Sequence, residues 1–158
     1  MPTNTKNRAM EALADLGLAL PSPPRPVASY VPSVQTGNLL IVSGQLPFKD
    51  GTLLAMGKVP SAVSLEKAQE CARQCILNAL AVVAGESRSL DRVARIVRLG
   101  VFVASDEGFA DQPKVANGAS DLLQQIFGES GRHARAAVGT NALPLNACVE
   151  IEMMVELV

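Results

Sequence analysis

This chain of 158 residues has few aromatic side chains and almost no net charge. It contains no Trp, one Tyr and four Phe, and aromatic residues make up 3 % of the composition. Its core must therefore be built from aliphatic side chains and Met. The 14 Lys and Arg residues nearly balance the 15 Asp and Glu residues, for a formal net charge of −1. Because nucleic-acid binding usually relies on a basic face and on stacking aromatics, we expect no nucleic-acid partner.

Long apolar runs and a metal-ligand pattern are also missing. No stretch approaches the ~20 apolar residues of a membrane span, and the first eight residues are polar, so we expect a soluble, cytoplasmic protein with no membrane partner. The cysteines are Cys71, Cys75 and Cys148, and the lone His133 cannot complete a four-ligand zinc site with the first two. We expect free, buried thiols, as in a reducing compartment, and no metal.

The length and composition predict one globular domain over residues 1–158. Hydrophobic residues make up 48 % and charged residues 18 % of the chain, enough to bury a substantial core. Residues 4–16 show helical spacing and are followed by a Pro-rich segment. We therefore interpret residues 1–25 as an N-terminal helix and a stiff connector.

The remaining pattern predicts an α+β fold. We expect strands at 27–34, 38–43, 52–56 and 96–103, and helices over 64–84 and from about 111 to 128. Ser64 would cap the first of these helices and Gly85 would end it. Two helices on one face of a mixed sheet are the economical arrangement. In the last strand the odd positions from 149 to 157 would lie beneath the helices, and the even positions would place Glu150, Glu152 and Glu156 on the opposite face. Closure into an oligomer would cover that face.

Two alternating apolar runs flank the segment 143–146, Leu-Pro-Leu-Asn, a pattern typical of a β-hairpin. A hairpin turning there would place Arg135 opposite Glu150 and His133 opposite Glu152, with each pair on one face. The first pair could be an ordinary surface ion pair, worth about 0–1 kcal/mol. His133 could serve as an acid or base, although we interpret it as one half of a structural pair.

The same segment resembles the C-terminal signature of the Rid family (reactive intermediate deaminases, formerly called YjgF-like proteins). In that signature an Arg precedes a Leu-Pro turn, and a Glu follows within a strand that here spans residues 149–152, Val-Glu-Ile-Glu. A second block resembles the N-terminal signature of the family. It consists of Tyr30, the Gly-Asn pair at 37–38 and the run Ser-Gly-Gln-Leu-Pro at 43–47. Both blocks have matching internal spacing and occur in the right order, and the resemblance covers about residues 26–158.

This resemblance implies a chorismate-mutase-like (YjgF-like) fold and a homotrimeric barrel with clefts between its subunits. It also implies cofactor-free hydrolysis of small enamines and imines, such as 2-aminoacrylate, to 2-oxo acids and ammonia. Arg135 matches the residue that holds the carboxylate of the small-molecule substrate, and Glu150 the residue that orients water. Tyr30, Ser43 and Gly44 match further substrate-binding positions. A planar guanidinium suits a carboxylate, and a carboxylate can accept a proton from attacking water.

The chain departs from the family pattern at two positions. Many deaminase members carry a Cys where this chain has Ala137, and the family Asn could correspond to Asn117 or to Ser120. The same cleft could also belong to a regulatory module that binds a small carboxylate without turnover, because one fold hosts several functions. The endoribonuclease and translation-inhibitor names that some members carry are disfavoured by the balanced charge and the few aromatics.

Overall fold

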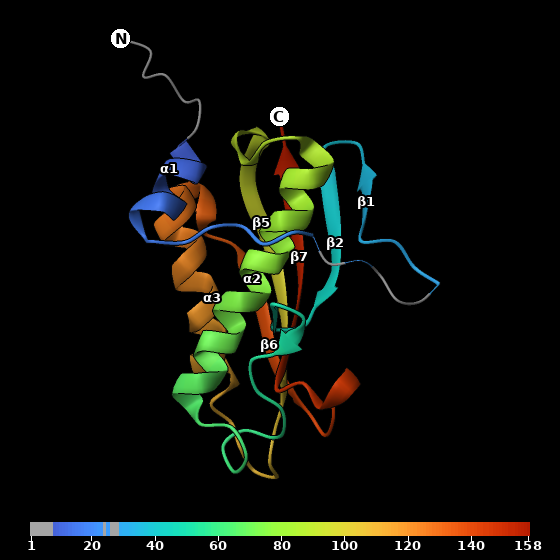
Figure 1. Ribbon diagram of the computed structural model, residues 1–158, viewed down its shortest axis with the longest axis vertical. Coiled ribbons are helices and arrows are strands. Elements are labelled where there is room, and N and C mark those ends of the chain that lie inside the picture. Colours follow the sequence, from blue (N-terminus) through green and yellow to red (C-terminus); the bar gives the residue numbers. More distant parts are fainter. Residues whose placement is uncertain (1–7, 24, 26–28) are drawn as a thin grey trace.

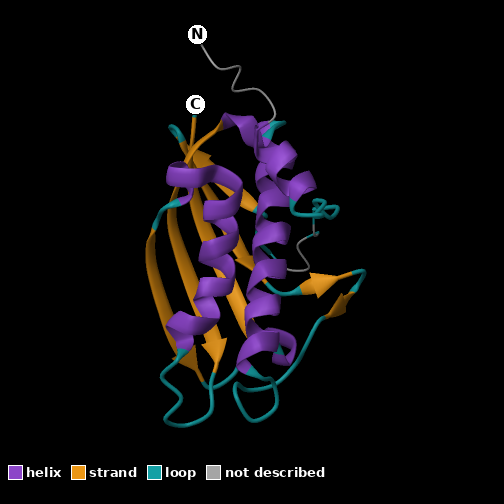
Figure 2. Ribbon diagram, turned by 90° about the vertical axis from the view of Figure 1, so that its left-hand side faces the viewer, coloured by secondary structure: helices purple, strands orange, loops and turns teal. Residues whose placement is uncertain are grey.

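The computed structural model describes residues 8–23, 25 and 29–158 and has two layers, a mixed sheet and a pair of long helices. Helices α2 (Leu65–Ser87) and α3 (Gln112–Phe127) pack against each other and together cover one face of the sheet (Figures 1 and 2). The predicted α+β class, with its two helices on one side, is confirmed. Within the described part of the chain, no helix combines the length and the apolarity needed to cross a bilayer.

The sheet has five strands in the order β1-β2-β7-β5-β6. The strands span Ser33–Thr36 (β1), Leu39–Gln45 (β2), Val93–Ala104 (β5), Ala134–Thr140 (β6) and Val149–Leu157 (β7). Strand β7 is antiparallel to both of its neighbours, β2 and β5, whereas β6 runs parallel to β5 at the edge. Strands β3 (Phe48–Lys49) and β4 (Thr52–Leu53) form a separate small hairpin.

The predicted hairpin between the last two strands is wrong, because β5 lies between them. Arg135 is registered with Leu99 of β5, and Glu150 is registered with Phe102 of the same strand. The elements β5, α3 and β6 form a strand–helix–strand crossover, a connection that joins parallel strands. Burial explains the placement: every odd position of β7 is buried, as a central strand requires, whereas β6 alternates between exposed and partly buried residues.

The core lies between the helices and the sheet. The odd positions of β7 point into it as predicted, and α2 buries more than half of its residues there. Ser64 caps α2, as expected, by accepting a hydrogen bond from the Lys67 backbone N–H. The helix runs past Gly85 and ends at Ser87, before Arg88 in the left-handed conformation, so the predicted end is three residues too early.

The N-terminal segment packs on the helical layer. Helix α1 (Arg8–Asp15) buries Ala9 and Leu13 and contacts α3, and the chain then crosses the helices toward β1 (Figure 1). A tight turn joins β1 to β2, with Gly37 at φ 57°. Residues 4–7 of the expected helix, 24 of the connector and 27–28 of the first expected strand lie outside the described residues.

Candidate active site

Arg135, the predicted carboxylate-binding residue, stands on the helix-covered side of the edge strand β6. Its partner in the register, Leu99, is fully buried, so the Arg135 side chain also points toward the helical layer. Its Nη1 donates hydrogen bonds to Asn117 Oδ1 (2.9 Å) and to Ser120 Oγ (3.0 Å). Both acceptors belong to α3 and lie three residues apart, on one face of the helix. The two residues that the sequence left as alternatives thus both contact this guanidinium.

Both of these bonds use Nη1. Among residues 8–23, 25 and 29–158, Nε and Nη2 of Arg135 donate no hydrogen bond, and no carboxylate is paired with the guanidinium. One edge of the guanidinium is therefore free to hold a planar anion in the bidentate manner that Arg favours. Arg135, Asn117 and Ser120 line a cavity of about 360 Å³ between α3 and β6.

His133 extends the same polar cluster. Its Nε2 lies 2.9 Å from Ser120 Oγ, and its Nδ1 lies 2.6 Å from the carbonyl oxygen of Gly131. The predicted position of His133 opposite Glu152 is wrong, since the two are separated by β5. Burial and the nearby positive charge of Arg135 lower the pKa of His133, so the imidazole is neutral near pH 7.

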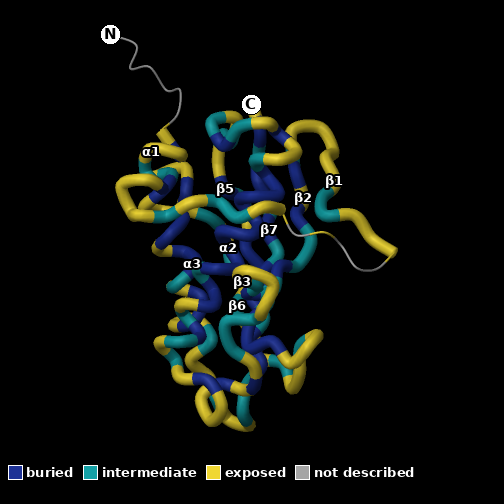
Figure 3. The backbone as a smooth tube through the Cα atoms, in the orientation of Figure 1, coloured by how far each residue is buried: buried dark blue, intermediate teal, exposed yellow. Residues whose placement is uncertain are grey.

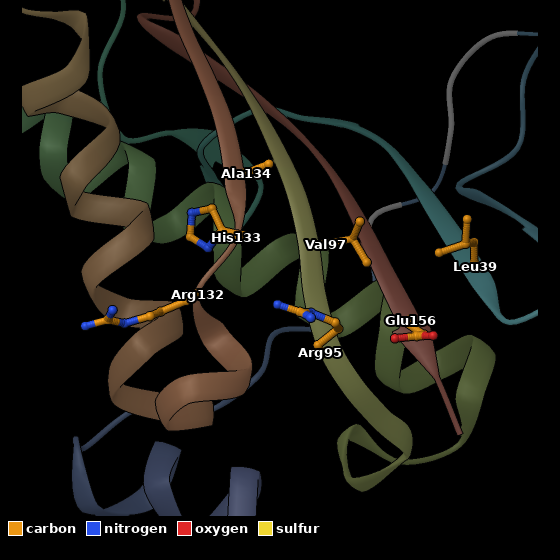
Figure 4. A pocket seen from close by; sticks show the side chains of 7 residues that line it. All are labelled: Leu39, Arg95, Val97, Arg132, His133, Ala134 and Glu156. Atoms are coloured by element: carbon orange, nitrogen blue, oxygen red, sulfur yellow. The ribbon is translucent and has the colours of Figure 1, made fainter.

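A second hollow, of about 570 Å³, opens beside this cluster toward the uncovered face of the sheet. Figure 4 shows Arg132 and His133 extending toward α3, whereas Arg95 and Glu156 stand on β5 and β7. Arg132 is paired with Glu129 at 3.5 Å. The basic side chains at this hollow therefore do not converge on one point.

Glu150, the predicted water-orienting residue, lies on the uncovered face of the sheet. It is partly buried, and no hydrogen bond or ion pair to it occurs among the described residues. Its carboxylate rests over Gly44 of β2, where a Cβ atom would lie against it. Burial, and to a smaller extent the neighbouring Glu152, raise the pKa of Glu150. A carboxylate with a raised pKa and no partner is suited to accept a proton.

Glu152 shows the contrasting arrangement two residues further along. Its carboxylate lies over Gly100 of β5 and is paired with Arg98, with Arg98 Nη1 3.1 Å from Glu152 Oε1. The guanidinium of Arg98 offsets the charge of this carboxylate, whereas no cation in the described part of the chain is paired with Glu150. The difference supports the assignment of Glu150, and not Glu152, as the candidate base.

The two remaining predicted residues are Ser43 of β2 and Tyr30, which precedes β1. Ser43 directly precedes Gly44, and its Oγ donates a hydrogen bond of 2.6 Å to the carbonyl oxygen of Val31. This bond fixes the segment next to Tyr30, whose side chain is 51 % exposed. Figure 3 shows this segment as an exposed stretch beside β1.

The structure thus divides the predicted residues into two groups. Arg135 lies with Asn117, Ser120 and His133 on the helical side of β6, while Glu150 lies with Gly44 and Ser43 on the uncovered face. Strand β5 separates them, and their side chains point to opposite faces of one sheet.

The cysteines belong to neither of these groups. Ala137 leaves no thiol beside Arg135, and all three cysteines are buried in the core, where burial raises the pKa of Cys75. Within the described ranges, no group of three His, Cys, Asp or Glu side chains is arranged to hold a metal ion.

Comparison with known proteins shows the same fold and family. Residues 10–157 match the model of the family described as "YjgF/chorismate_mutase-like, putative endoribonuclease". A Trypanosoma cruzi protein named Protein TCP17 is 42 % identical over 158 residues, which cover 99 % of each chain. An Escherichia coli protein named 2-iminobutanoate/2-iminopropanoate deaminase is 31 % identical over 85 % of this chain and 92 % of its own.

Among solved structures, protein Atu1372 of Agrobacterium tumefaciens, described as of unknown function, superposes with a TM-score of 0.89. It is 42 % identical, and the match covers 97 % of this chain and 94 % of that one. The sheet with two helices on one side and the family match over residues 10–157 lead to one conclusion: this chain belongs to the YjgF/chorismate-mutase-like, or Rid, family.

Proposed function

We propose that this protein hydrolyses small 2-imino acids and their enamine tautomers to 2-oxo acids and ammonia, without a cofactor. The observation that carries the proposal is the free edge of Arg135, whose guanidinium is held from one side only by Asn117 and Ser120. The name of the Escherichia coli relative supports the reaction class. The name of the Trypanosoma cruzi relative assigns no reaction.

In this proposal the catalytic centre lies between two copies of the chain. Arg135 and Glu150 face opposite sides of one sheet, so a single chain cannot bring them to one small substrate. Rotational assembly would place the helical edge of β6 in one copy beside the uncovered face of another. A homotrimer closed in this way would complete the site and cover the carboxylate-bearing face.

The chemistry follows from the two groups. The Arg135 fork would hold the substrate carboxylate and place the adjacent imine carbon. Glu150 of a second copy would accept a proton as water attacks that carbon and would return it to the nitrogen, which gives a carbinolamine. Glu150 would then take the hydroxyl proton of the carbinolamine and pass it to the amino group, so that ammonia can leave. The C–N bond then breaks, leaving the 2-oxo acid and ammonia. Gly44 would give the Glu150 carboxylate room to reach the water.

The test is to mix the protein with the freshly formed imine product of an amino-acid oxidase and to follow imine loss. Turnover at substoichiometric protein is expected. The variant Arg135→Ala should weaken binding of a 2-oxo acid such as pyruvate by about 10- to 100-fold, because hydrogen bonds to charged groups contribute about 1.5–3 kcal/mol. Arg135→Lys should restore little, since an ammonium cannot reproduce the fork.

Two results would contradict the proposal. Saturable pyruvate binding with no turnover would identify a binding module. Unchanged binding by Arg135→Ala together with a lowered melting temperature would show that Arg135 only connects β6 to α3.

A further inference from the structure

His133, the only histidine of the sequence, belongs to a series of hydrogen bonds in which Arg135 is the first donor and the carbonyl oxygen of Gly131 is the last acceptor. A backbone carbonyl can only accept, so the contact of 2.6 Å with the Gly131 oxygen requires a proton on His133 Nδ1. In the neutral ring Nε2 then carries the lone pair, and Ser120 must donate its hydroxyl proton to it across 2.9 Å. With that proton committed, Ser120 Oγ turns its lone pairs toward Arg135 Nη1, 3.0 Å away.

We propose that His133 is a positioning residue that, through Ser120, fixes the Arg135 guanidinium for a substrate carboxylate. The inference rests on the proposed function, because it deepens the same site. Asn117 alone would leave the guanidinium free to rotate about a single contact, whereas the second acceptor fixes its plane. Ser120 is only 6 % exposed and the imidazole is partly buried, so water cannot easily replace either partner.

The direction of these hydrogen bonds depends on the charge of the imidazole. A protonated His133 would donate from Nε2 to Ser120 and would displace the hydroxyl proton that now points to it. It would also place a second positive charge beside Arg135. The other charged groups at this cavity are Arg132, which is paired with Glu129, and Asp121 on α3. Neither has a hydrogen bond to the His133–Ser120 pair in the described part of the chain.

This series of hydrogen bonds can be tested without any ligand, because a single histidine gives a single set of imidazole NMR signals. At pH 7.5 the ¹⁵N shifts should show the Nδ1–H tautomer, the minor form in water. Ser120→Ala should move the Nε2 signal, and Arg135→Ala should raise the pKa of His133, because it removes the neighbouring charge. Ser87→Ala is the matched control. It removes another buried hydroxyl, bonded to Val83 O and to Ser89 O, at the far end of α2.

The functional arm measures pyruvate affinity. His133→Leu should weaken binding about tenfold, whereas His133→Gln should bind nearly as wild type, because its amide oxygen can accept from Ser120. The double variant Ser120→Ala/His133→Leu should bind no more weakly than Ser120→Ala, since the two residues act in series. A merely structural histidine would instead lower thermal stability in both His133 variants and leave affinity unchanged.

The NMR and affinity measurements distinguish a failure of the proposed function from a failure of the positioning role of His133. If wild-type protein does not bind pyruvate, the proposed function fails, and the NMR arm still decides the role of His133. Three results would overturn the positioning role. They are an Nε2–H tautomer, imidazole signals that do not change in Ser120→Ala and Arg135→Ala, and affinity losses that add up in the double variant.

Discussion

Two carboxylates of β7 each lie in a notch formed by a glycine of a neighbouring strand, which gives a matched pair of substitutions. A Cβ at Gly44 would stand 3.0 Å from Glu150 Cδ and 3.2 Å from its Cγ, and a Cβ at Gly100 would stand 3.0 Å from Glu152 Cδ and 2.7 Å from its Cγ. Neither glycine has a positive φ, so Ala fits both backbones. Each Gly→Ala change must therefore push one carboxylate aside without straining the chain.

The effect of each change on stability should be small. Crowding of a packed site costs about 1–3 kcal/mol, and the restricted unfolded chain of an Ala variant returns about 0.4–1 kcal/mol. Both carboxylates sit at the ends of flexible side chains, so the lower part of this range applies. Gly100→Ala also breaks the exposed Arg98–Glu152 pair, worth about 0–1 kcal/mol. Both variants should fold, with similar melting temperatures.

Gly44→Ala and Gly100→Ala should differ in their rate of imine hydrolysis. A carboxylate displaced by about 1 Å from its water can cost about 10²-fold in rate, so Gly44→Ala should lose that factor in imine hydrolysis while Gly100→Ala keeps most of it. Light scattering on both variants checks that assembly is unaffected. Equal activity of the two variants, or a loss confined to Gly100→Ala, would refute the assignment of Glu150.

Two further predictions concern Glu150 itself. Glu150→Gln should retain pyruvate binding but lose about 10²–10⁴ in imine turnover, measured at substrate saturation, because an amide cannot accept the proton; an unchanged rate would demote Glu150 to a structural residue. The raised pKa of Glu150 means that its contribution to stability is present below the ordinary glutamate pKa of 4.5 and is lost as the pH rises through the raised value. Glu150→Gln should therefore unfold at a higher temperature than wild type at pH 7.5 but not at pH 4, and equal melting shifts at both pH values would contradict this. In the pH profile of the wild-type rate, the midpoint of the acid limb should lie above pH 4.5.

Local patterns of the sequence predicted the elements of the fold well. Alternation over 149–157 placed the odd residues of β7 in the core, and Ser64 was recognised as the cap of α2, because both features depend on neighbours in the chain. The family and its fold followed from two short blocks, around Ser43 and around Arg135, and residues 10–157 match the family model.

Strand pairing could not be predicted in the same way. The segment 143–146 satisfied the local rules for a hairpin turn, yet the partner of a strand is decided by burial across the whole sheet. The order of strand 93–104, helix 112–127 and strand 134–140 contained the missing signal, because such a unit usually joins parallel strands. The contact between His133 and Ser120 depends on how α3 packs on β6, and no spacing in the sequence indicates it.

The central claim is that Arg135 and Glu150 act together from different copies of the chain, and mixed oligomers test it most directly. Arg135→Ala and Glu150→Gln should each be nearly inactive alone. After the two variants are co-refolded in equal amounts, random assembly in a closed ring should give about a quarter of the sites both native groups. The mixture is therefore expected to recover about a quarter of the wild-type rate of imine hydrolysis. A mixture that forms wild-type-sized oligomers by light scattering but remains as inactive as its components would contradict the account.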